Sequence, residues 1–95
     1  MKKLTIVRFK PKPEHFDAFV QELKQASTAP DRTAILNSFI MTKEDEVFSI
    51  VIRHADKLEE DAKRGVQTLD GMRHMLQEYN EVDRHTIPLT GDLVE

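Results

Sequence analysis

The chain has 95 residues, with 14 Lys or Arg against 17 Asp or Glu, and a formal net charge of −3 at pH 7. This length predicts a single domain over residues 1–95, and the acidic balance argues against a nucleic-acid partner or a polybasic membrane anchor. The chain contains no cysteine, which excludes disulfides, thiolate catalysis and Cys-ligated metal centres. It also lacks an apolar run near the ~20 residues of a membrane span and the apolar region of a signal peptide, so we expect a cytoplasmic protein without a membrane partner.

The first third of the chain predicts a strand and then an amphipathic helix. Residues 3–10 are β-branched and aromatic, and prolines end this run. A proline also suits the first turn of a helix, and apolar residues then recur at i, i+3, i+4 and i+7. This spacing predicts a helix over residues 13–27, which the segment 28–31 ends.

The middle of the chain predicts a β-hairpin. Residues 33–42 and 47–53 are rich in β-branched and aromatic residues, and the charged residues 43–46 between them form the expected hairpin loop. The segment 47–53 carries the strongest strand signal in the chain.

The last third predicts a second helix and a fourth strand. Asp56 and Glu59 have the spacing of a capping box. The apolar stripe that follows predicts a helix to about residue 79, interrupted by Asp70-Gly71. A weaker strand over residues 82–89 follows, and its proline favours the edge of the sheet; the tail 90–95 would extend it.

The order β-α-β-β-α-β predicts an α+β, ferredoxin-like fold. In this fold a four-stranded antiparallel sheet carries both helices on one face. A sheet whose other face is open to water should alternate apolar and polar residues, and these strands do not. We therefore expect a second copy of the chain to cover that face, giving a sheet-to-sheet homodimer.

Residue parity on the third strand predicts which side chains meet the partner. Phe48, Ile50, Ile52 and, near the strand end, His54 are expected to face the helices. The alternate set is expected to line a partly apolar chamber between the two copies, suited to a small ligand: Val47, Ser49, Val51 and Arg53. The alternative for Ser49 is a small residue at a packed interface, and the facing of the last strand stays open.

Three features together resemble a known family: the segment 6–19, the strand from Val47 to Arg53 followed at once by the helix at 56, and the late apolar turn 72–79. The chain resembles the antibiotic-biosynthesis-monooxygenase-like (quinol monooxygenase-like) group of the dimeric α/β-barrel superfamily. The resemblance implies a dimer, and in some members oxidation of quinols or anthrones by O2 with neither metal nor flavin, so we expect no cofactor. Haem-degrading relatives use a first-strand Asn and a Trp, both missing here, which excludes that activity.

Oxidation of a phenol by O2 needs a base to form the phenolate, and a cation or amide to stabilise it. The candidate catalytic residues are therefore His74, His85 and Arg53. The candidate substrate-binding residues are Asn37, Ser49, Met41 and Tyr79. Each also has a plain structural interpretation, such as local hydrogen bonding or core filling.

Two kinds of function remain open for this sequence. One is a cofactor-independent monooxygenase-like enzyme acting on a small aromatic hydroxyl compound. The other is a non-catalytic small-molecule-binding or structural dimer. No two histidines have the i, i+4 spacing of a helical metal site, so we expect no metal.

Overall fold

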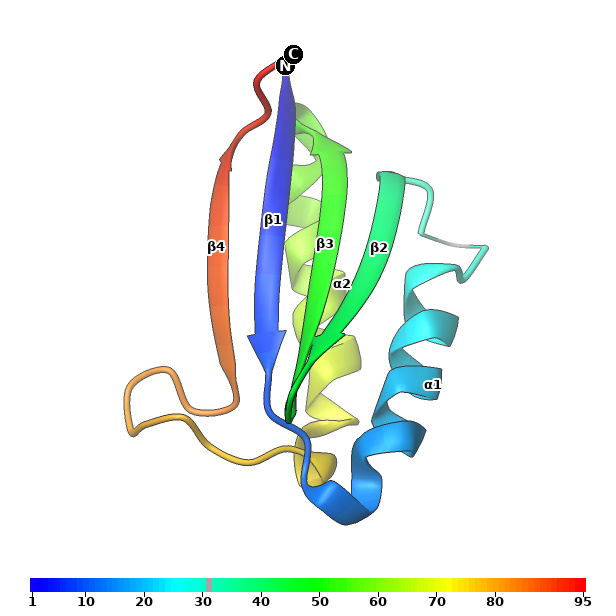
Figure 1. Cartoon of the computed structure of the whole chain (residues 1–95). Coiled ribbons are helices and arrows are strands. Elements are labelled where there is room, and N and C mark those ends of the chain that lie inside the picture. Colours follow the sequence, from blue (N-terminus) through cyan, green and yellow to red (C-terminus); the bar gives the residue numbers. More distant parts are fainter. Residues whose placement is uncertain (31) are drawn as a thin grey trace.

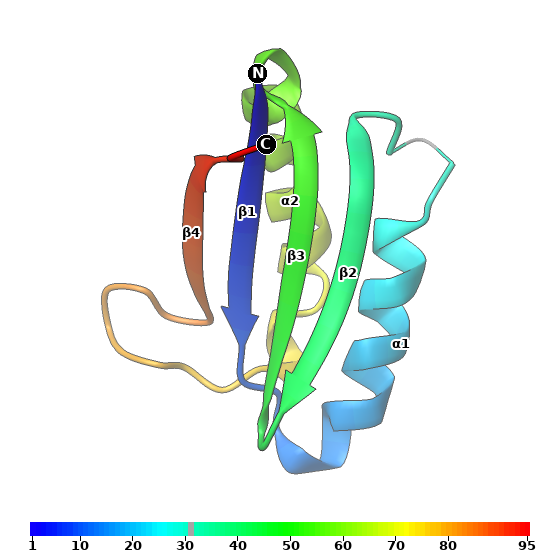
Figure 2. The same ribbon diagram turned by 45° about the horizontal axis from the view of Figure 1, so that its top comes forward.

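The computed structural model describes residues 1–30 and 32–95 and shows one antiparallel sheet backed by two helices (Figure 1). The strands are β1 (Lys2–Phe9), β2 (Ile35–Lys43), β3 (Glu46–His54) and β4 (Thr86–Asp92). Their spatial order across the sheet is β2-β3-β1-β4. The helices are α1 (Phe16–Ser27) and α2 (Leu58–Asp70). The predicted ferredoxin-like fold is confirmed, and Figure 2 shows the two termini at the same end of the sheet.

The first helix and the hairpin form where the sequence predicts them. A single 3-10 turn at Pro13–His15 leads into α1, and the hydroxyl of Thr28 donates to the carbonyl of Lys24 at 2.9 Å where the helix ends. Asp31, the last residue of the predicted helix-ending segment, lies outside the described residues. Between β2 and β3 the chain turns through two residues, of which Glu44 has a positive φ of 56°.

The second helix is shorter than predicted at both ends. No side-chain capping bond forms at its start, where Ala55–Lys57 make a 3-10 turn, so the predicted capping box is wrong. After Asp70 only the 3-10 turn Arg73–Met75 follows, and the predicted helix to residue 79 is also wrong. The backbone beyond this turn instead bonds to the segment after β1, with Gln77 N–H donating to the carbonyl of Lys10 at 2.8 Å.

The hydrophobic core lies at one end of the space between sheet and helices. The rings of Phe9 and Phe19 pack with centroids 5.0 Å apart. The other members come from the end of α1, the start of β3 and the segment after α2: Leu23, Val47, Met72, Met75 and Leu76. The apolar residues after α2 are therefore buried as expected, although they are not helical.

The predicted facing of β3 is wrong. Val47, Ser49 and Arg53 are buried beneath the helices, with 0%, 7% and 6% of their surfaces exposed. Phe48, Ile50 and Ile52 therefore point to the other face, because neighbours on a strand alternate. His54, predicted to face the helices, is exposed. Both faces of this strand carry apolar side chains, so the pattern of apolar and polar residues along it did not show which face packs against the helices.

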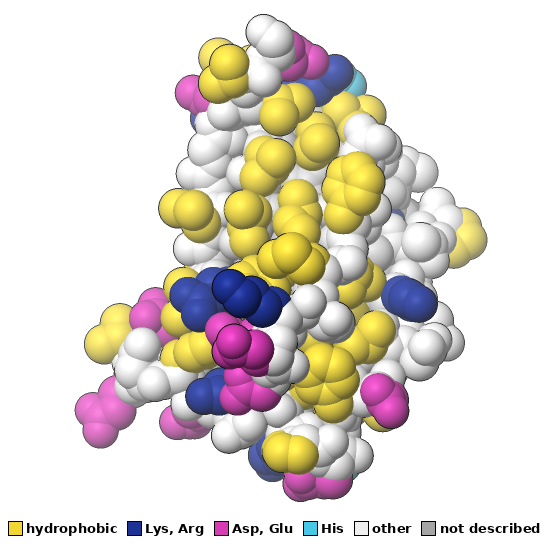
Figure 3. Space-filling model, viewed as in Figure 1, with side chains coloured by type: hydrophobic (Ala, Val, Ile, Leu, Met, Phe, Trp, Pro, Cys, Tyr) yellow, Lys and Arg dark blue, Asp and Glu magenta, His cyan; other side chains and the backbone are white. Residues whose placement is uncertain are grey.

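The face of the sheet away from the helices carries a hydrophobic patch, which we call the open face. The strand register places on it Leu4, Ile6, Asn37, Phe39, Met41, Phe48, Ile50, Ile52, Ile87 and Leu89. Figure 3 looks onto this face and shows hydrophobic side chains gathered across the middle of the sheet. Phe39, Met41 and Leu89 are exposed to 55%, 48% and 69%, so this patch is uncovered in a single chain.

β4 is an edge strand, as its proline predicted, but it begins at Thr86 rather than at residue 82. Its register with β1 settles the facing that the sequence left open. Thr86, Pro88 and Thr90 face the helices, while Ile87 and Leu89 lie on the open face. Within residues 1–30 and 32–95, no helix has the length and apolar character needed to cross a membrane.

Candidate functional site

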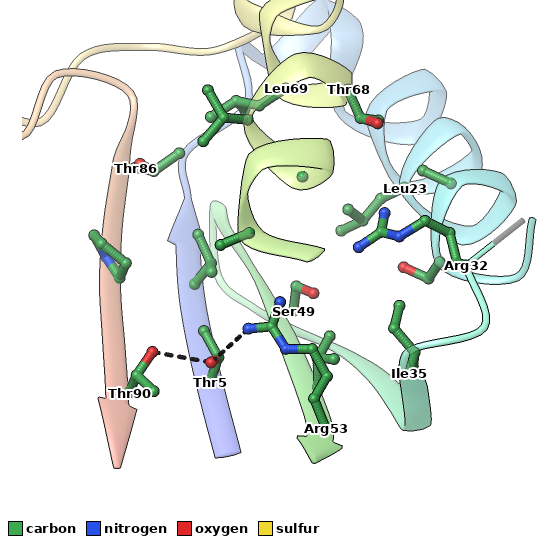
Figure 4. A pocket seen from close by; sticks show the side chains of 18 of the residues that line it. Thr5, Leu23, Arg32, Ile35, Ser49, Arg53, Thr68, Leu69, Thr86 and Thr90 are labelled. Atoms are coloured by element: carbon green, nitrogen blue, oxygen red, sulfur yellow. Dashed lines mark hydrogen bonds between the residues drawn. The ribbon is translucent and has the colours of Figure 1, made fainter. Parts of the chain in front are cut away.

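A cavity of about 520 Å³ lies between α2 and the helix-facing side of the sheet, beside the hydrophobic core (Figure 4). Most of its wall is apolar and comes from both helices and the inner strands: Val7, Leu23, Val51, Leu58, Leu69 and Met72. Val66 and Pro88 also line it and are exposed, so the cavity opens to solvent where α2 faces β4. This cavity lies inside a single chain, whereas the sequence predicted a chamber between two copies, which stays a prediction.

The side of α2 toward the cavity bears small residues. Its predicted apolar stripe, which includes Leu58, Ala62 and Val66, lines the cavity, as does Gly65. A Cβ atom built on Gly65 would meet no atom within 4 Å. The small residues Ala62 and Gly65 leave part of the space beneath the helix unfilled, which gives room for a ligand.

One end of the cavity is polar, and Arg53 on β3 is its centre. Nη1 of Arg53 donates to Oδ2 of Asp61 at 2.6 Å, and Nη2 donates to Oγ1 of Thr5 at 2.8 Å. The Thr5 and Thr90 hydroxyls lie 2.9 Å apart, and Ser49 lines the same end (Figure 4). Three strands thus supply a guanidinium and three hydroxyls to one end of an otherwise apolar space.

Asp61 on α2 joins two arginines. It is 2% exposed, and both of its oxygens accept 2.9 Å hydrogen bonds from Arg32, which also lines the cavity. Burial raises the pKa of Asp61, but the hydrogen bonds and charges of Arg32 and Arg53 outweigh it and hold the pKa below its ordinary 3.8. Among the described residues, two guanidiniums therefore share one carboxylate at this end, which gives it a net charge of about +1.

The structure brings together only two of the predicted site residues. Arg53 and Ser49 line the cavity. Asn37 and Met41 lie on the open face instead, and both are exposed. The roles predicted for these four residues stay predictions, but only the first two share a cavity.

The two histidines predicted as bases lie outside the cavity lining. His74 is exposed, with its ring centroid 6.1 Å from that of His15. His85 is buried, and its Nδ1 accepts from Nη1 of Arg73 at 3.2 Å. Burial and the charges of Arg73, Arg84 and Lys12 lower the pKa of His85 against the opposing effect of Glu78. Its catalytic role, like that of His74, stays a prediction.

Tyr79 belongs to a polar cluster at the end of the open face. Its hydroxyl donates to Oε1 of Glu46 at 2.6 Å, and Arg8 donates to both oxygens of that carboxylate. The guanidinium of Arg8 lies 5.7 Å from the ring centroids of both Phe48 and Tyr79. The hydrogen bonds from Tyr79 and Arg8 lower the pKa of Glu46, although burial alone would raise it. Burial and the neighbouring Glu46 carboxylate raise the pKa of Tyr79. Glu46, expected in a solvated loop, is thus structural.

Tyr79→Phe is expected to lower the free energy of unfolding by about 1–2 kcal/mol, because it removes a hydrogen bond to a charged acceptor. Urea denaturation at pH 7 measures this loss. The pKa of Glu46 is lowered in the folded chain, so the loss should shrink as acid protonates this carboxylate. An equal loss in a Glu46→Gln background would show that the negative charge of Glu46 does not contribute to the effect of the hydroxyl.

Several residues of the polar end were missing from the sequence-based candidates. Asp61 did carry a signal, because it lies three residues after Leu58 and next to Ala62, within the apolar stripe of a predicted helix. A charged residue in such a stripe is seldom buried without a partner. Arg32 and the two threonines gave no comparable signal, since strand pairing and a loop bring them together. Among the described residues, no three His, Asp or Glu side chains are grouped as metal ligands.

Comparison with known proteins identifies the fold. No family model matches the sequence, and no curated protein matches it. Among solved structures, a candidate antibiotic biosynthesis monooxygenase from Chloroflexus aurantiacus J-10-fl superposes with a TM-score of 0.74 at 10% identity, covering 100% of this chain and 95% of that one. Rv0793 from Mycobacterium tuberculosis gives 0.72 at 14% identity, covering 100% and 97%.

A third structure is described as a cofactor-independent oxygenase. It is a single-residue mutant of SnoaB from Streptomyces nogalater, with a TM-score of 0.65 at 9% identity, covering 99% of this chain and 94% of that one. At these identities the likeness concerns the fold. The chain therefore has the fold of the antibiotic-biosynthesis-monooxygenase-like proteins, as its sequence pattern predicted.

Proposed function

We propose that the protein is a cofactor-independent monooxygenase-like enzyme that acts on a small aromatic hydroxyl compound of the quinol or anthrone type. The observation that carries the proposal is the open cavity of about 520 Å³, with apolar walls and a cationic, hydroxyl-lined end. Apolar cavities with a few convergent polar groups are typical of small-molecule sites. The fold shared with an oxygenase adds support.

In this proposal the aromatic rings of the substrate pack against the apolar walls, and its hydroxyl lies at the polar end. Arg53 and the hydroxyl of Ser49 stabilise the phenolate, which lowers the cost of releasing the proton. The electron-rich phenolate then reduces O2. With an anthrone, the ring CH2 becomes a carbonyl with one oxygen atom of O2, and the other oxygen leaves as water with the two hydrogens.

Gly65→Leu is expected to lower the rate of O2 consumption at least tenfold relative to the parent chain, because the new side chain enters the cavity. Leu and Ala both favour a helix over Gly, by up to about 1 kcal/mol, so neither substitution should unfold α2. An oxygen electrode with a panel of quinols and anthrones measures the rate, and Gly65→Ala is the matched control that keeps most of the space. Equal rates for the two variants would place the reaction elsewhere.

The alternative is a binding protein without turnover, and the same cavity supports it. It predicts saturable binding of an aromatic compound that Gly65→Leu blocks, with no O2 uptake above the protein-free rate across the panel. That combination would replace the enzymatic proposal.

We also propose a homodimer in which the open faces of two chains pack together. The exposed, largely apolar open face supports this assembly, because a soluble single chain seldom exposes such a patch (Figure 3). The cavity lies on the opposite side of the sheet and remains accessible in this arrangement.

A further inference from the structure

We propose that the ligand of the cavity is an anion: an aromatic compound that carries a carboxylate beside its phenolic hydroxyl, with both groups held at the Arg32–Arg53 end. This inference rests on the cavity of the proposed function and adds the charge of its substrate. It is carried by the charge balance and by the donors that the polar end offers.

In the part of the chain that the structure describes, the polar end has one positive charge more than its buried carboxylate can balance. The Arg32 and Arg53 side chains are 12% and 8% exposed, and that of Asp61 is 1% exposed. Glu59 also lines the cavity, but it is exposed, and solvent screens its charge. An uncompensated buried charge is costly, and a carboxylate on the ligand would complete the balance.

The donors at this end exceed the acceptors that the chain supplies. A guanidinium has five N–H groups, and Arg53 uses two of them on Asp61 and Thr5. Its Nε also has no hydrogen-bond partner in the described part of the chain, but this atom is fully buried and lies out of reach of a ligand. Asp61 already accepts three hydrogen bonds from the two arginines. Figure 4 shows Ser49 beside the guanidinium group of Arg53, and an acceptor on a ligand at this end would bind N–H groups of the arginines that have no acceptor in the chain.

The remainder of the cavity selects the body of the ligand. Beyond the polar end its lining is mainly aliphatic, from residues such as Val51, Leu69 and Met72. Such walls favour a flat apolar ring system and offer little to a sugar or an amino-acid backbone. A hydroxylated polycyclic carboxylate satisfies both ends of the cavity.

Two probes of nearly equal shape test the inference by isothermal titration calorimetry at pH 7.5: 2-naphthoate, which is ionised, and 2-naphthamide, which is neutral. We expect the parent chain to bind the carboxylate about 10- to 100-fold more tightly, the effect of a charge-assisted hydrogen bond. In Arg32→Gln the polar end becomes neutral, and the preference should fall below about threefold. Lys63→Gln removes the same charge from the exposed, non-lining side of α2 and should keep the preference.

A double variant controls for folding. Arg32→Gln with Asp61→Asn restores the charge of +1 through Arg53 alone, and the preference for 2-naphthoate should return. Equal binding of the two probes by the parent chain, a preference unchanged in Arg32→Gln, or a Kd for 2-naphthoate above about 1 mM would each overturn the inference. O2 uptake with neutral quinols would then still support the monooxygenase proposal, so the two failures are distinguishable.

Discussion

Asp61→Ala is expected to lower the free energy of unfolding by about 3–5 kcal/mol, the cost of breaking a buried ion pair by removing one partner. The carboxylate is 2% exposed and accepts three hydrogen bonds from Arg32 and Arg53. Its removal leaves two guanidiniums facing each other in a poorly solvated space. Chemical denaturation at pH 7, followed by far-UV circular dichroism, measures the loss.

Glu60→Ala is the matched control, because Glu60 is the neighbouring acidic residue of α2 and is exposed. Surface substitutions of this kind change stability by less than about 0.5 kcal/mol. Equal effects of the two substitutions would show that Asp61 contributes no more than a surface charge, and the charge balance of the polar end would have to be abandoned.

The same carboxylate predicts how stability depends on pH. The pKa of Asp61 is lowered in the folded chain, so the unfolded chain binds the proton more readily. Its contribution is therefore complete above the ordinary pKa of 3.8 and is lost as the pH falls through the folded value. The difference in stability between the parent chain and Asp61→Asn should accordingly shrink below about pH 4.

Phe39→Asp is expected to convert the proposed dimer to a monomer at micromolar concentrations. Phe39 lies on the open face and is 55% exposed in a single chain, so the substitution should leave the fold of that chain intact. In the proposed dimer the new carboxylate would be buried in an apolar interface without a partner, at a cost of several kcal/mol. Analytical ultracentrifugation measures the association constant.

Val82→Asp provides the control for this assembly. Val82 is 92% exposed but belongs to the loop before β4 rather than to the sheet, so its substitution should leave the dimer unchanged. A parent chain that sediments as a monomer, or a dimer that survives Phe39→Asp, would refute packing through the open face. Val51, which the strand parity placed at the interface between two copies, lines the cavity instead, so Val51→Asp would not test the dimer.

The order of the elements and the fold followed from local patterns in the sequence. The period of about 3.6 residues over 13–27 and the β-branched runs at 3–10 and 47–53 each favour one local structure. Topological rules then leave few ways to join them, and the ferredoxin-like arrangement is among the simplest. The resemblance in fold was visible for the same reason, since it too depends on pattern rather than on particular catalytic residues.

The facing of the strands required the tertiary structure. On β3 both parities carry apolar residues, and Arg53 is buried with Asp61 on α2 and Thr5 on β1 as its hydrogen-bond partners. The helical spacing of apolar residues likewise continues past Met75, but there the backbone hydrogen-bonds to the segment after β1 and forms no helix. Neither effect leaves a periodic signal, because the partners are distant in sequence.

The candidate site divides in the same way. Composition and parity pointed to Arg53 and Ser49 as a polar pair on one strand face, and the cavity contains both. Arg32, Asp61, Thr5 and Thr90 join them from a loop, a helix and two more strands. Local pattern reports the periodicity of one segment at a time, whereas the charge balance of a cavity depends on side chains from separate segments, which only the folded chain brings into contact.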